Sequence, residues 1–496
     1  MDHFISRDRA ENDLLDCAAF MAERVKSGDG HAEAVAEVVP RYLAKGDVDL
    51  AAEMANAVDD PYSRDRMLIL VAQKCAEIDD DDYALQLADA VEDHGLRSQA
   101  VERIALAKAR KGQHEKAEDI AASLVHPDQV LAGIAVNQAT NGNEAGAEET
   151  LARIEFATAR AAACQIIAAY HLDNKEREKA VASLVAALEA ADEIEHDEER
   201  LRALCDIGNA FTDVGRKDSA IETFEIARSA AEALDNVHRD YFLVNSALGF
   251  MYAGSQELSE RTLDLVTDKT QMASALLGIA RYEWKNDEKT DAVDSLDEAY
   301  QILKSQRDIE TRDSRARNAL MASIAVQFAG FDKYELAVEI AQENNDLAEQ
   351  YGALTQIAQV MSLNGHDEIA RQTVNEIPED ANRLFAFVGM SDAKNQLKET
   401  DAAIALLDEA AELSETVPQL ASRSGVLNEI ASRYIAFGLT EKARAVTLEN
   451  LAVIADIRDE SSRAASITGI ADLYTASALE LTGEEKNLLK TLAMKA

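Results

Sequence analysis

Proline, glycine and aromatic residues are scarce in this sequence. Its 496 residues include 5 prolines and 21 glycines, and aromatic side chains make up 5%. Few prolines favour long uninterrupted helices and argue against sandwiches or barrels that need many turns. Hydrophobic residues nevertheless make up 47%, which is enough for a large buried core. The composition therefore predicts a long helical protein.

Basic residues are also in short supply. Fifty lysines and arginines stand against 92 aspartates and glutamates, which gives a formal net charge of −42. Because phosphate contacts need a basic surface, we expect no nucleic-acid partner. An acidic surface keeps a large protein soluble, and a saline habitat is a second explanation for it.

The four cysteines are widely spaced and form no C-x-x-C pair. Cys75, Cys164 and Cys205 fall in apolar helical patterns that are typical of buried free thiols, whereas Cys17 lies near the N-terminus. No run approaches the roughly 18 apolar residues of a membrane span, and the first residues lack the apolar core of a signal peptide. We therefore expect a cytoplasmic protein with no membrane partner.

No catalytic or metal-binding pattern stands out. The sequence has no glycine-rich phosphate loop, no H-E-x-x-H and no G-x-S-x-G. The acidic runs 79–82 and 195–199 lack the glycine and the spacing of an EF-hand. We expect no enzyme, no cofactor and no metal. An α/α-barrel hydrolase is the less favoured alternative, because its sugar platforms need aromatics and only one tryptophan is present.

What the chain does contain is one recurring spacing. From Ile207 to Ala220 the sequence reads I-G-N-A-F-T-D-V-G-R-K-D-S-A, a helix end, a turn at Gly215 and the start of a second helix. A branched apolar residue precedes Gly or Ala, and a small residue follows thirteen positions after the branched one. The same spacing begins at Val38, Val71, Ile104, Ile134, Ile167, Ile279, Ile324, Ile357 and Ile430, and less regular units begin at Leu248, Val388 and Ile470.

These positions resemble the tetratricopeptide repeat (TPR). That family places an aromatic residue three positions after the Gly or Ala, and this place holds Phe211, Tyr252, Phe328, Tyr434 and Tyr474. The family's initial tryptophan is absent. The resemblance covers residues 31 to about 483 and implies an all-α, right-handed α-solenoid (superhelix) of about thirteen helix-turn-helix repeats. One hairpin cannot bury both of its apolar faces, so the units must stack.

We expect three segments along the chain. Residues 1–30 are predicted to be an N-terminal capping helix with its apolar residues on one side, and residues 31–480 the TPR-like solenoid. Residues 481–496 are predicted to be a C-terminal capping helix that covers the open end of the array. Thr482 and Glu485 have the spacing of a capping box at the start of this helix.

The resemblance also implies where a partner would bind. In the family, six positions of each first helix face a concave groove: −5, −2, −1, +2, +5 and +6 relative to the branched residue. In the twelve units from Val71 to Ile470, these 72 positions hold eight basic and seven acidic side chains, so the predicted groove is nearly neutral. Amides there could bond to an extended peptide. The predicted partner-binding residues are Gln165, Asn209, Phe250, Arg281, Trp284, Lys285, Gln356, Gln359, Phe387 and Met390.

Two features have both a functional and a structural interpretation. Trp284 is either a binding hot spot or a packed residue of the solenoid. An arginine recurs seven positions before the branched residue, either as a row of anion binders or as structural ion pairs, and in four units an aspartate precedes it by four. These residues are Arg64, Arg97, Arg160, Arg200, Arg317, Arg423 and Arg463, with Asp60, Asp93, Asp313 and Asp459.

The function implied by the family is non-catalytic protein–protein interaction. We expect a scaffold or adaptor that binds a protein or peptide partner in its groove. A self-assembling structural protein, built through contacts between solenoids, is the first alternative.

Overall fold

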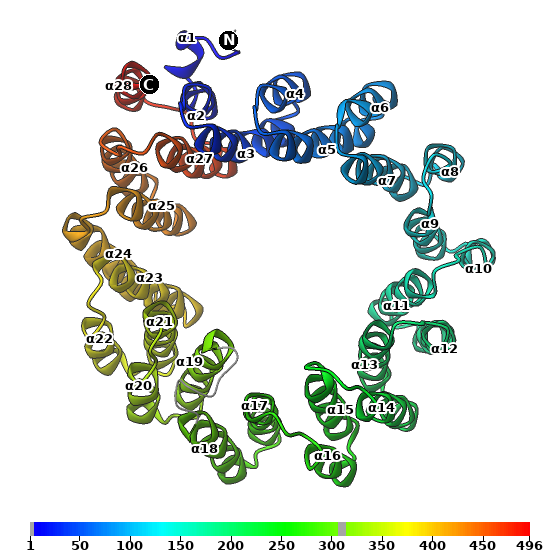
Figure 1. The fold of residues 1–496 in the computed structure, drawn as a ribbon. Helices are drawn as coiled ribbons and strands as arrows, with labels where there is room; N and C mark the ends of the chain where they lie inside the picture. Colours follow the sequence, from blue (N-terminus) through cyan, green and yellow to red (C-terminus); the bar gives the residue numbers. More distant parts are fainter. Residues whose placement is uncertain (1–3, 306–313) are drawn as a thin grey trace. The chain divides into compact units, whose positions relative to one another are not determined.

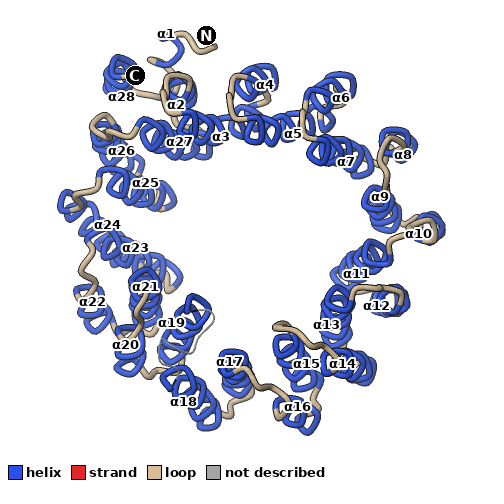
Figure 2. Tube along the Cα trace, viewed as in Figure 1, coloured by secondary structure: helices blue, strands red, loops and turns tan. Residues whose placement is uncertain are grey.

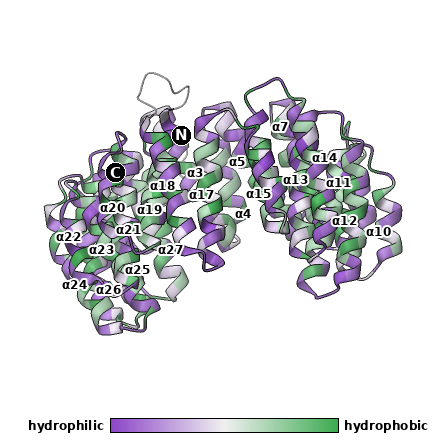
Figure 3. Ribbon diagram, turned by 90° about the horizontal axis from the view of Figure 1, so that it is seen from below, coloured by the Kyte–Doolittle hydropathy of each residue, from purple (hydrophilic) through white to green (hydrophobic). Residues whose placement is uncertain are grey.

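The structure is a computed structural model that describes residues 4–305 and 314–496. These residues form helices and loops, and the described part of the chain contains no strand (Figure 2). This confirms the prediction of an all-α protein. Hydrophobic residues alternate with hydrophilic ones along the helices, as expected where each helix buries one side (Figure 3). None of the described helices is long and apolar enough to cross a membrane.

The chain divides into two compact units. Unit 1 comprises Met1–Ala100, Tyr334–Glu343 and Leu347–Ala496, and unit 2 comprises Val101–Lys333 and Asn344–Asp346. The predicted division into residues 1–30, 31–480 and 481–496 stays a prediction.

Unit 1 holds both termini of the chain. Its helices are α1 (Arg7–Ala10), α2 (Leu14–Ala22), α3 (Gly28–Lys45), α4 (Val48–Asn56), α5 (Pro61–Glu77), α6 (Asp81–Ala90), the start of α7 (His94–Arg110), α20 (Tyr334–Gln342), α21 (Leu347–Leu363), α22 (Asp367–Asn375), α23 (Asp380–Gln396), α24 (Thr400–Leu413), the 3-10 helix η1 (Ser414–Thr416), α25 (Leu420–Ala436), α26 (Thr440–Ile454), α27 (Glu460–Ser477) and α28 (Gly483–Lys495).

Unit 2 continues from α7. Its helices are α8 (His114–Ala121), α9 (Asp128–Thr140), α10 (Glu144–Leu151), α11 (Ala157–Asp173), α12 (Arg177–Asp192), α13 (Asp197–Asp213), α14 (Lys217–Glu232), α15 (Arg239–Ala253), α16 (Gln256–Leu263), α17 (Lys269–Lys285), α18 (Lys289–Ser305) and α19 (Ser314–Gly330).

Within each unit, consecutive helices pack as hairpins. The pairs α5–α6, α11–α12, α13–α14 and α25–α26 are examples, and first helices such as α9 and α11 also pack on each other. The protein is therefore a helical repeat protein. The handedness of the array and the number of its repeats stay predictions.

A left-handed residue ends the first helix of each hairpin. This conformation strains any residue with a Cβ, so glycine takes it most easily. Among the described residues, seven glycines and six other residues have positive φ, and each one follows a first helix. They are Gly46, Asp79, Gly112, Gly142, Lys175, Gly215, Gly254, Asp287, Asp332, Gly365, Lys398, Gly438 and Ala478.

These left-handed residues give a structural register for the repeat. In the regular units they lie eight positions after the branched residue, as Gly215 follows Ile207. Gly254 therefore places the equivalent position at Ser246, two residues before Leu248. Ser246 is fully buried, and its hydroxyl donates to the carbonyl of residue 242 at 2.9 Å. The sequence register of this unit was wrong because a serine occupies the place of the branched residue.

In the second irregular unit the register predicted from sequence is also off by two residues, but toward the N-terminus. Lys398 is left-handed, so the equivalent of the branched residue is Met390 and not Val388. The small residue thirteen positions later is then Ala403, which is fully buried. The Ser391 hydroxyl donates to the carbonyl of Ala403 at 2.9 Å, which ties the two helices of this hairpin together.

Buried aspartates join one hairpin to the next. Asp65, Asp128 and Asp240 all lie six positions before the register residue. The Asp240 carboxylate accepts the backbone N–H groups of Thr267 and Asp268 at 2.7 and 2.5 Å, and the Thr267 hydroxyl at 2.9 Å. The other two accept the backbone N–H groups 27 and 28 positions further on. Each aspartate thus holds the two residues immediately before the next first helix.

The recurring arginines make a related contact. Arg97 donates to the carbonyl of Val91 at 2.8 and 3.0 Å, and Arg463 donates to the carbonyl of Ile457 at 2.9 Å. Arg160 makes the equivalent contact. These carbonyls lie in the loop before the arginine's own helix. The contacts favour the structural interpretation of the arginine row over a row of anion binders.

The aspartates four positions before these arginines cap helices. Asp60, Asp93 and Asp459 accept the backbone N–H three residues later at 2.7 to 2.8 Å. A side-chain acceptor at this place satisfies one of the free donors of the first turn. The predicted role as ion-pair partners is therefore replaced by N-capping in these three units. Asp313 lies outside the described residues.

The two ends of the chain meet within unit 1. Helix α2 packs along α27, α27 also packs against α3, and α28 packs on α26, α2 and α1 (Figure 1). All nine residues of α2 are buried. The Arg41 guanidinium of α3 bonds the Asp472 carboxylate of α27 at 2.8 to 3.0 Å. We call the contact between α1–α3 and α27–α28 the terminal seam.

A tyrosine contact shows which place α2 occupies. Tyr434 of α25 donates to Asp408 of α24, the preceding second helix, at 2.6 Å. Tyr42 of α3 donates to Asp16 of α2 at the same distance and the same separation of 26 residues. Helix α2 thus stands to α3 as a second helix stands to the next first helix. The expected amphipathic helix is corrected, since α2 is covered on all sides.

Candidate functional site

The first candidate site is a pocket between two neighbouring first helices of unit 1. It lies between α21 and α23 and has a volume of about 710 Å³. This falls within the range of ~300–1,000 Å³ that is typical of ligand sites. Its lining residues are Leu347, Ala348, Tyr351, Gly352, Thr355, Gln356, Pro378, Glu379, Asn382 and Phe385.

The walls of this α21–α23 pocket combine exposed apolar groups with amides. Leu347 is 59% exposed and Phe385 is 37% exposed, so two large apolar side chains face solvent. A Cβ placed on Gly352 would meet no atom within 4 Å, which leaves the floor open to an incoming group. The Asn382 amide donates to the Glu379 carboxylate at 2.7 Å and holds it at the rim. The pocket can take one bulky apolar group beside hydrogen-bonding amides.

Four of the ten predicted partner-binding residues lie in unit 1, and two of them are accessible while two are buried. Gln356 is exposed and lines the α21–α23 pocket, and Gln359 is half-buried one turn further on. Phe387 and Met390 are buried in the core. The prediction that these two line a groove is corrected, because the two-residue error of register turned them to the wrong side of α23.

The same error affects Phe250 in unit 2. It lies four positions after Ser246, a place that faces the core, and its side chain is fully buried. Its ring packs edge-on against Phe224 of α14 at 5.8 Å between centroids. Phe250 therefore belongs to the core of unit 2 and offers no surface to a partner.

Four other predicted partner-binding residues of unit 2 are at least partly accessible or bonded to a polar side chain. Gln165 is half-buried, and Asn209 and Lys285 are exposed. Arg281 donates to the side chain of Gln327 at 2.8 Å. Their binding role stays a prediction.

Trp284 is engaged inside unit 2. Its ring stacks on Phe331 at 4.1 Å between centroids and an interplanar angle of 17°, and the Lys289 ammonium lies 5.1 Å from its centroid. Stacked pairs of this kind contribute about 0.5–1.5 kcal/mol. The contacts favour a packing role for Trp284 over a free hot spot.

The structural register also finds residues that sequence reasoning missed. Tyr241 of α15 and Phe385 of α23 lie at the −5 position of the corrected units. Tyr252 of α15 lies at +6 and not at the family's aromatic position, which Phe250 takes. Tyr241, Tyr252 and Phe385 are 47%, 43% and 37% exposed, and the rings of Tyr252 and Tyr282 meet edge-on at 5.3 Å. The glycine at 254 was the available signal for α15, since it marks the end of the first helix.

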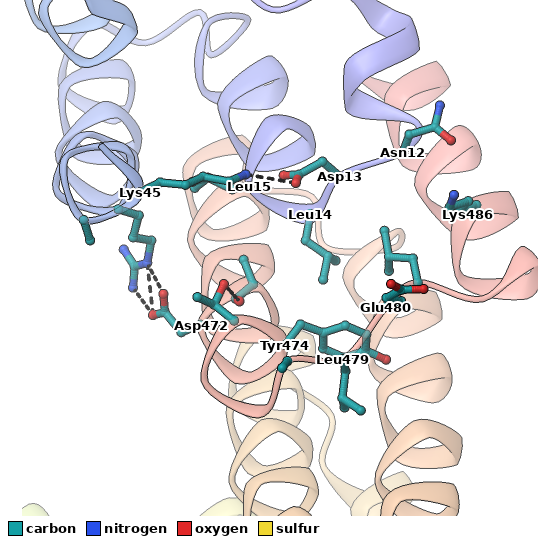
Figure 4. Close-up of a pocket in the computed structure, with 16 residues that line it drawn as sticks. Asn12, Asp13, Leu14, Leu15, Lys45, Asp472, Tyr474, Leu479, Glu480 and Lys486 are labelled. Carbon is teal, nitrogen blue, oxygen red and sulfur yellow. Dashed lines mark hydrogen bonds and ion pairs between the residues drawn. The ribbon is translucent and has the colours of Figure 1, made fainter. Parts of the chain in front are cut away.

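A second pocket lies in the terminal seam (Figure 4). It has a volume of about 590 Å³. The Lys45 ammonium bonds Asp13 at 3.0 Å, and Arg41 bonds Asp472 across the seam. Leu14 and Leu15 of α2 and Leu479 and Leu481 add apolar groups to the wall. Of these two ion pairs, only Arg41–Asp472 joins the two ends of the chain, since Lys45 and Asp13 both belong to the N-terminal side.

Neither site has the groups of a metal centre or of a reactive thiol. Among the residues that the structure describes, no group of three or more His, Cys, Asp or Glu side chains could hold a metal ion. All four cysteines are buried and unpaired. Burial raises the pKa of the Cys17 thiol to about 12, which suppresses the reactive thiolate.

Comparisons with known proteins add little to this description. No protein-family model matches the chain, and no curated protein matches it. One similar solved structure is Ton1535 from Thermococcus onnurineus NA1, with 16% identity, a TM-score of 0.24 and coverage of 81% of this chain and 98% of that chain. Another is a Signal Transduction ATPase with Numerous Domains protein with a tetratricopeptide repeat sensor from Pyrococcus horikoshii, with 10% identity, a TM-score of 0.26 and coverage of 96% and 86%. At these scores the two structures carry no argument about a site.

Proposed function

We propose that this chain is a non-catalytic, TPR-like scaffold that binds a polypeptide partner, with the α21–α23 pocket as its anchor. The right-handed solenoid, its concave groove and a cytoplasmic location belong to this proposal. One observation carries it: the pocket wall includes Gly352, Thr355, Gln356 and Phe385, all of them positions that the resemblance assigns to partner contact in the structural register.

The lining of the pocket indicates the chemistry of the partner. Leu347, Tyr351 and Phe385 suit one bulky apolar side chain, and burying such a side chain contributes roughly 1.5–3 kcal/mol. The Gln356 amide can both donate to and accept from a peptide backbone. An extended segment with an apolar anchor residue fits both features.

Charge does not select the partner at these positions. In the corrected register two basic positions leave the predicted inward set and one acidic position enters, so six basic and eight acidic side chains remain. The set stays nearly neutral although the chain carries −42. The partner segment is therefore expected to be selected by its apolar anchor and its backbone.

The test is a peptide selection against the full chain. Peptides selected from a random display library are measured by fluorescence anisotropy against wild type, Phe385→Ser and Gln356→Ala. We expect Phe385→Ser to weaken binding at least tenfold, which is about 1.4 kcal/mol, and Gln356→Ala to weaken it less. Ile369→Ser is the matched control, because Ile369 is 44% exposed on the second helix α22. Equal losses in Phe385→Ser and Ile369→Ser would refute the proposed pocket.

A further inference from the structure

We propose that the terminal seam is an end-to-end interface that also forms between two copies of this chain, so that α1–α3 of one copy seat on α27–α28 of another. The proposal does not depend on peptide binding. It rests on the contact that already exists inside one chain, and it names the occupant: a second copy of the same protein.

The seam buries surface that neither end can leave exposed. Every residue of α2 is buried, including Leu14, Phe20 and Met21. The facing helix α27 packs along α2, and the apolar residues Leu479 and Leu481 that follow it line the seam pocket. An opened chain would expose apolar surface at both ends, and such patches drive association.

The two sides of the seam are complementary in every copy. The N-terminal side presents Arg41 and the backbone N–H of Lys26, and the C-terminal side presents Asp472 and Glu460. Because the two sides are different surfaces of one chain, a contact between copies is heterologous, as in head-to-tail assemblies. Two opened copies can therefore satisfy both seams reciprocally with the same bonds that one closed copy makes.

The seam also contains a feature that weakens it. The pocket of about 590 Å³ lies within it, so its walls lack part of the close packing of a protein interior. This cavity reduces the free energy needed to separate the two sides.

Charge reversal across the seam tests the exchange in the full chain. Arg41→Glu places two carboxylates opposite each other within one chain, and Asp472→Arg places two guanidinium groups opposite each other. In each single variant, positions 41 and 472 carry like charges, which repel each other both within one chain and between identical copies. When the two variants are co-expressed, both contacts between the different copies pair opposite charges.

The expected result is a mixture-specific dimer. A tag on the Arg41→Glu chain should retain the untagged Asp472→Arg chain, with a mass of twice 54.0 kDa by light scattering. Tagged and untagged copies of the same variant should co-purify no more than wild type does. The chain that carries both substitutions should be monomeric, since its opposite charges pair again within one molecule.

The buried Cys17 of α2 gives an independent readout of seam opening. Mass spectrometry after treatment with a thiol reagent should show Cys17 labelled roughly tenfold faster in either single variant than in wild type. The double variant should label at the wild-type rate. Cys205 is the internal control, because it is buried in unit 2 and should keep its rate in all variants.

Two results would overturn the proposal. One is co-purification of the two variants no greater than that of wild-type chains, with all species at the mass of one chain. The other is an unchanged rate of Cys17 labelling in both single variants. If a single variant loses helicity by circular dichroism, recovery of helicity in the double variant supports the seam, and failure of the double variant to recover refutes it.

Discussion

Phe224 makes the packing of unit 2 sensitive to one methyl group. Its ring is fully buried and projects from α14 toward α13 and α15. A Cβ placed on Gly249 of α15 would lie 2.3 Å from two carbons of this ring, and a Cβ on Gly208 of α13 would lie 2.7 Å from it. The ring therefore fills the space between two first helices and lies close to the backbone of both.

We predict that Gly249→Ala destabilises unit 2. Overpacking of a core costs about 1–3 kcal/mol, and the gain from replacing glycine by alanine in a helix offsets ~0.5–1 kcal/mol of it. The ring is held on both sides, so a net loss of about 1–2 kcal/mol is expected. Hydrogen exchange followed by mass spectrometry should show amides of α14 and α15 exchanging roughly tenfold faster, since 1.4 kcal/mol is a factor of ten.

The matched control is Gly425→Ala in α25. Gly425 is also inside a first helix, but a Cβ there would meet no atom within 4 Å. This variant should be stabilised by about 0.5–1 kcal/mol through helix propensity alone. Phe224→Leu in the Gly249→Ala background should recover part of the loss. If Gly249→Ala and Gly425→Ala raised stability equally, the proposed close packing of the Phe224 ring against Gly249 would be wrong.

Three further predictions concern single side chains. Ala478→Gly should raise the urea midpoint by relieving the left-handed strain, with a gain of about 0.5–1 kcal/mol; a lower midpoint would contradict that strain. Ala220→Trp should lower stability by about 1–3 kcal/mol, because Ala220 is fully buried, and an unchanged melting curve would place it elsewhere. Burial raises the pKa of Asp240, but the N–H groups of Asp268 and Thr267 and the Thr267 hydroxyl outweigh it, and the pKa is lowered. A carboxyl whose pKa is lowered by folding stabilises the fold at pH values above its unfolded pKa, and this stabilisation is lost as the pH falls through the folded pKa. Asp240→Asn should therefore lower the free energy of unfolding at pH 7 and leave it equal to that of wild type in acid. A difference in stability that persisted in acid would contradict this assignment.

The hairpins could be predicted from sequence because each regular unit repeats a local rule. A branched residue such as Ile207 packs into the core, a left-handed residue such as Gly215 ends the first helix, and a small residue such as Ala220 lets the second helix approach. All three fall within fourteen residues. Nothing distant in the sequence is needed to recognise them.

The register failed in two of the three irregular units because Ser246 and Met390, and no branched residue, fill the branched position. At Ser246 a hydroxyl that donates to a carbonyl of its own helix replaces an apolar side chain, so the sequence pattern points to the nearby Leu248 instead. Two positions along a helix correspond to about 200° of rotation, which exchanges the buried face for the exposed one. That error placed Phe250 and Met390 on a binding surface. For α15 the glycine at 254 was the better marker, because glycine takes the left-handed conformation most easily, whereas Lys398 after α23 carries no such signal in the sequence.

The seam could not be predicted from any local pattern, because α2 and α27 are more than 400 residues apart. One signal was present: Leu14–Ala22 contains a single charged residue, and a helix that is apolar all round is buried on every side. An array with free ends needs a polar outer face on each terminal repeat. Here α2 covers the apolar face of α27, and α27 covers that of α2. Each end of the chain therefore acts as the cap of the other end. Loss of either end should therefore uncover apolar surface at both.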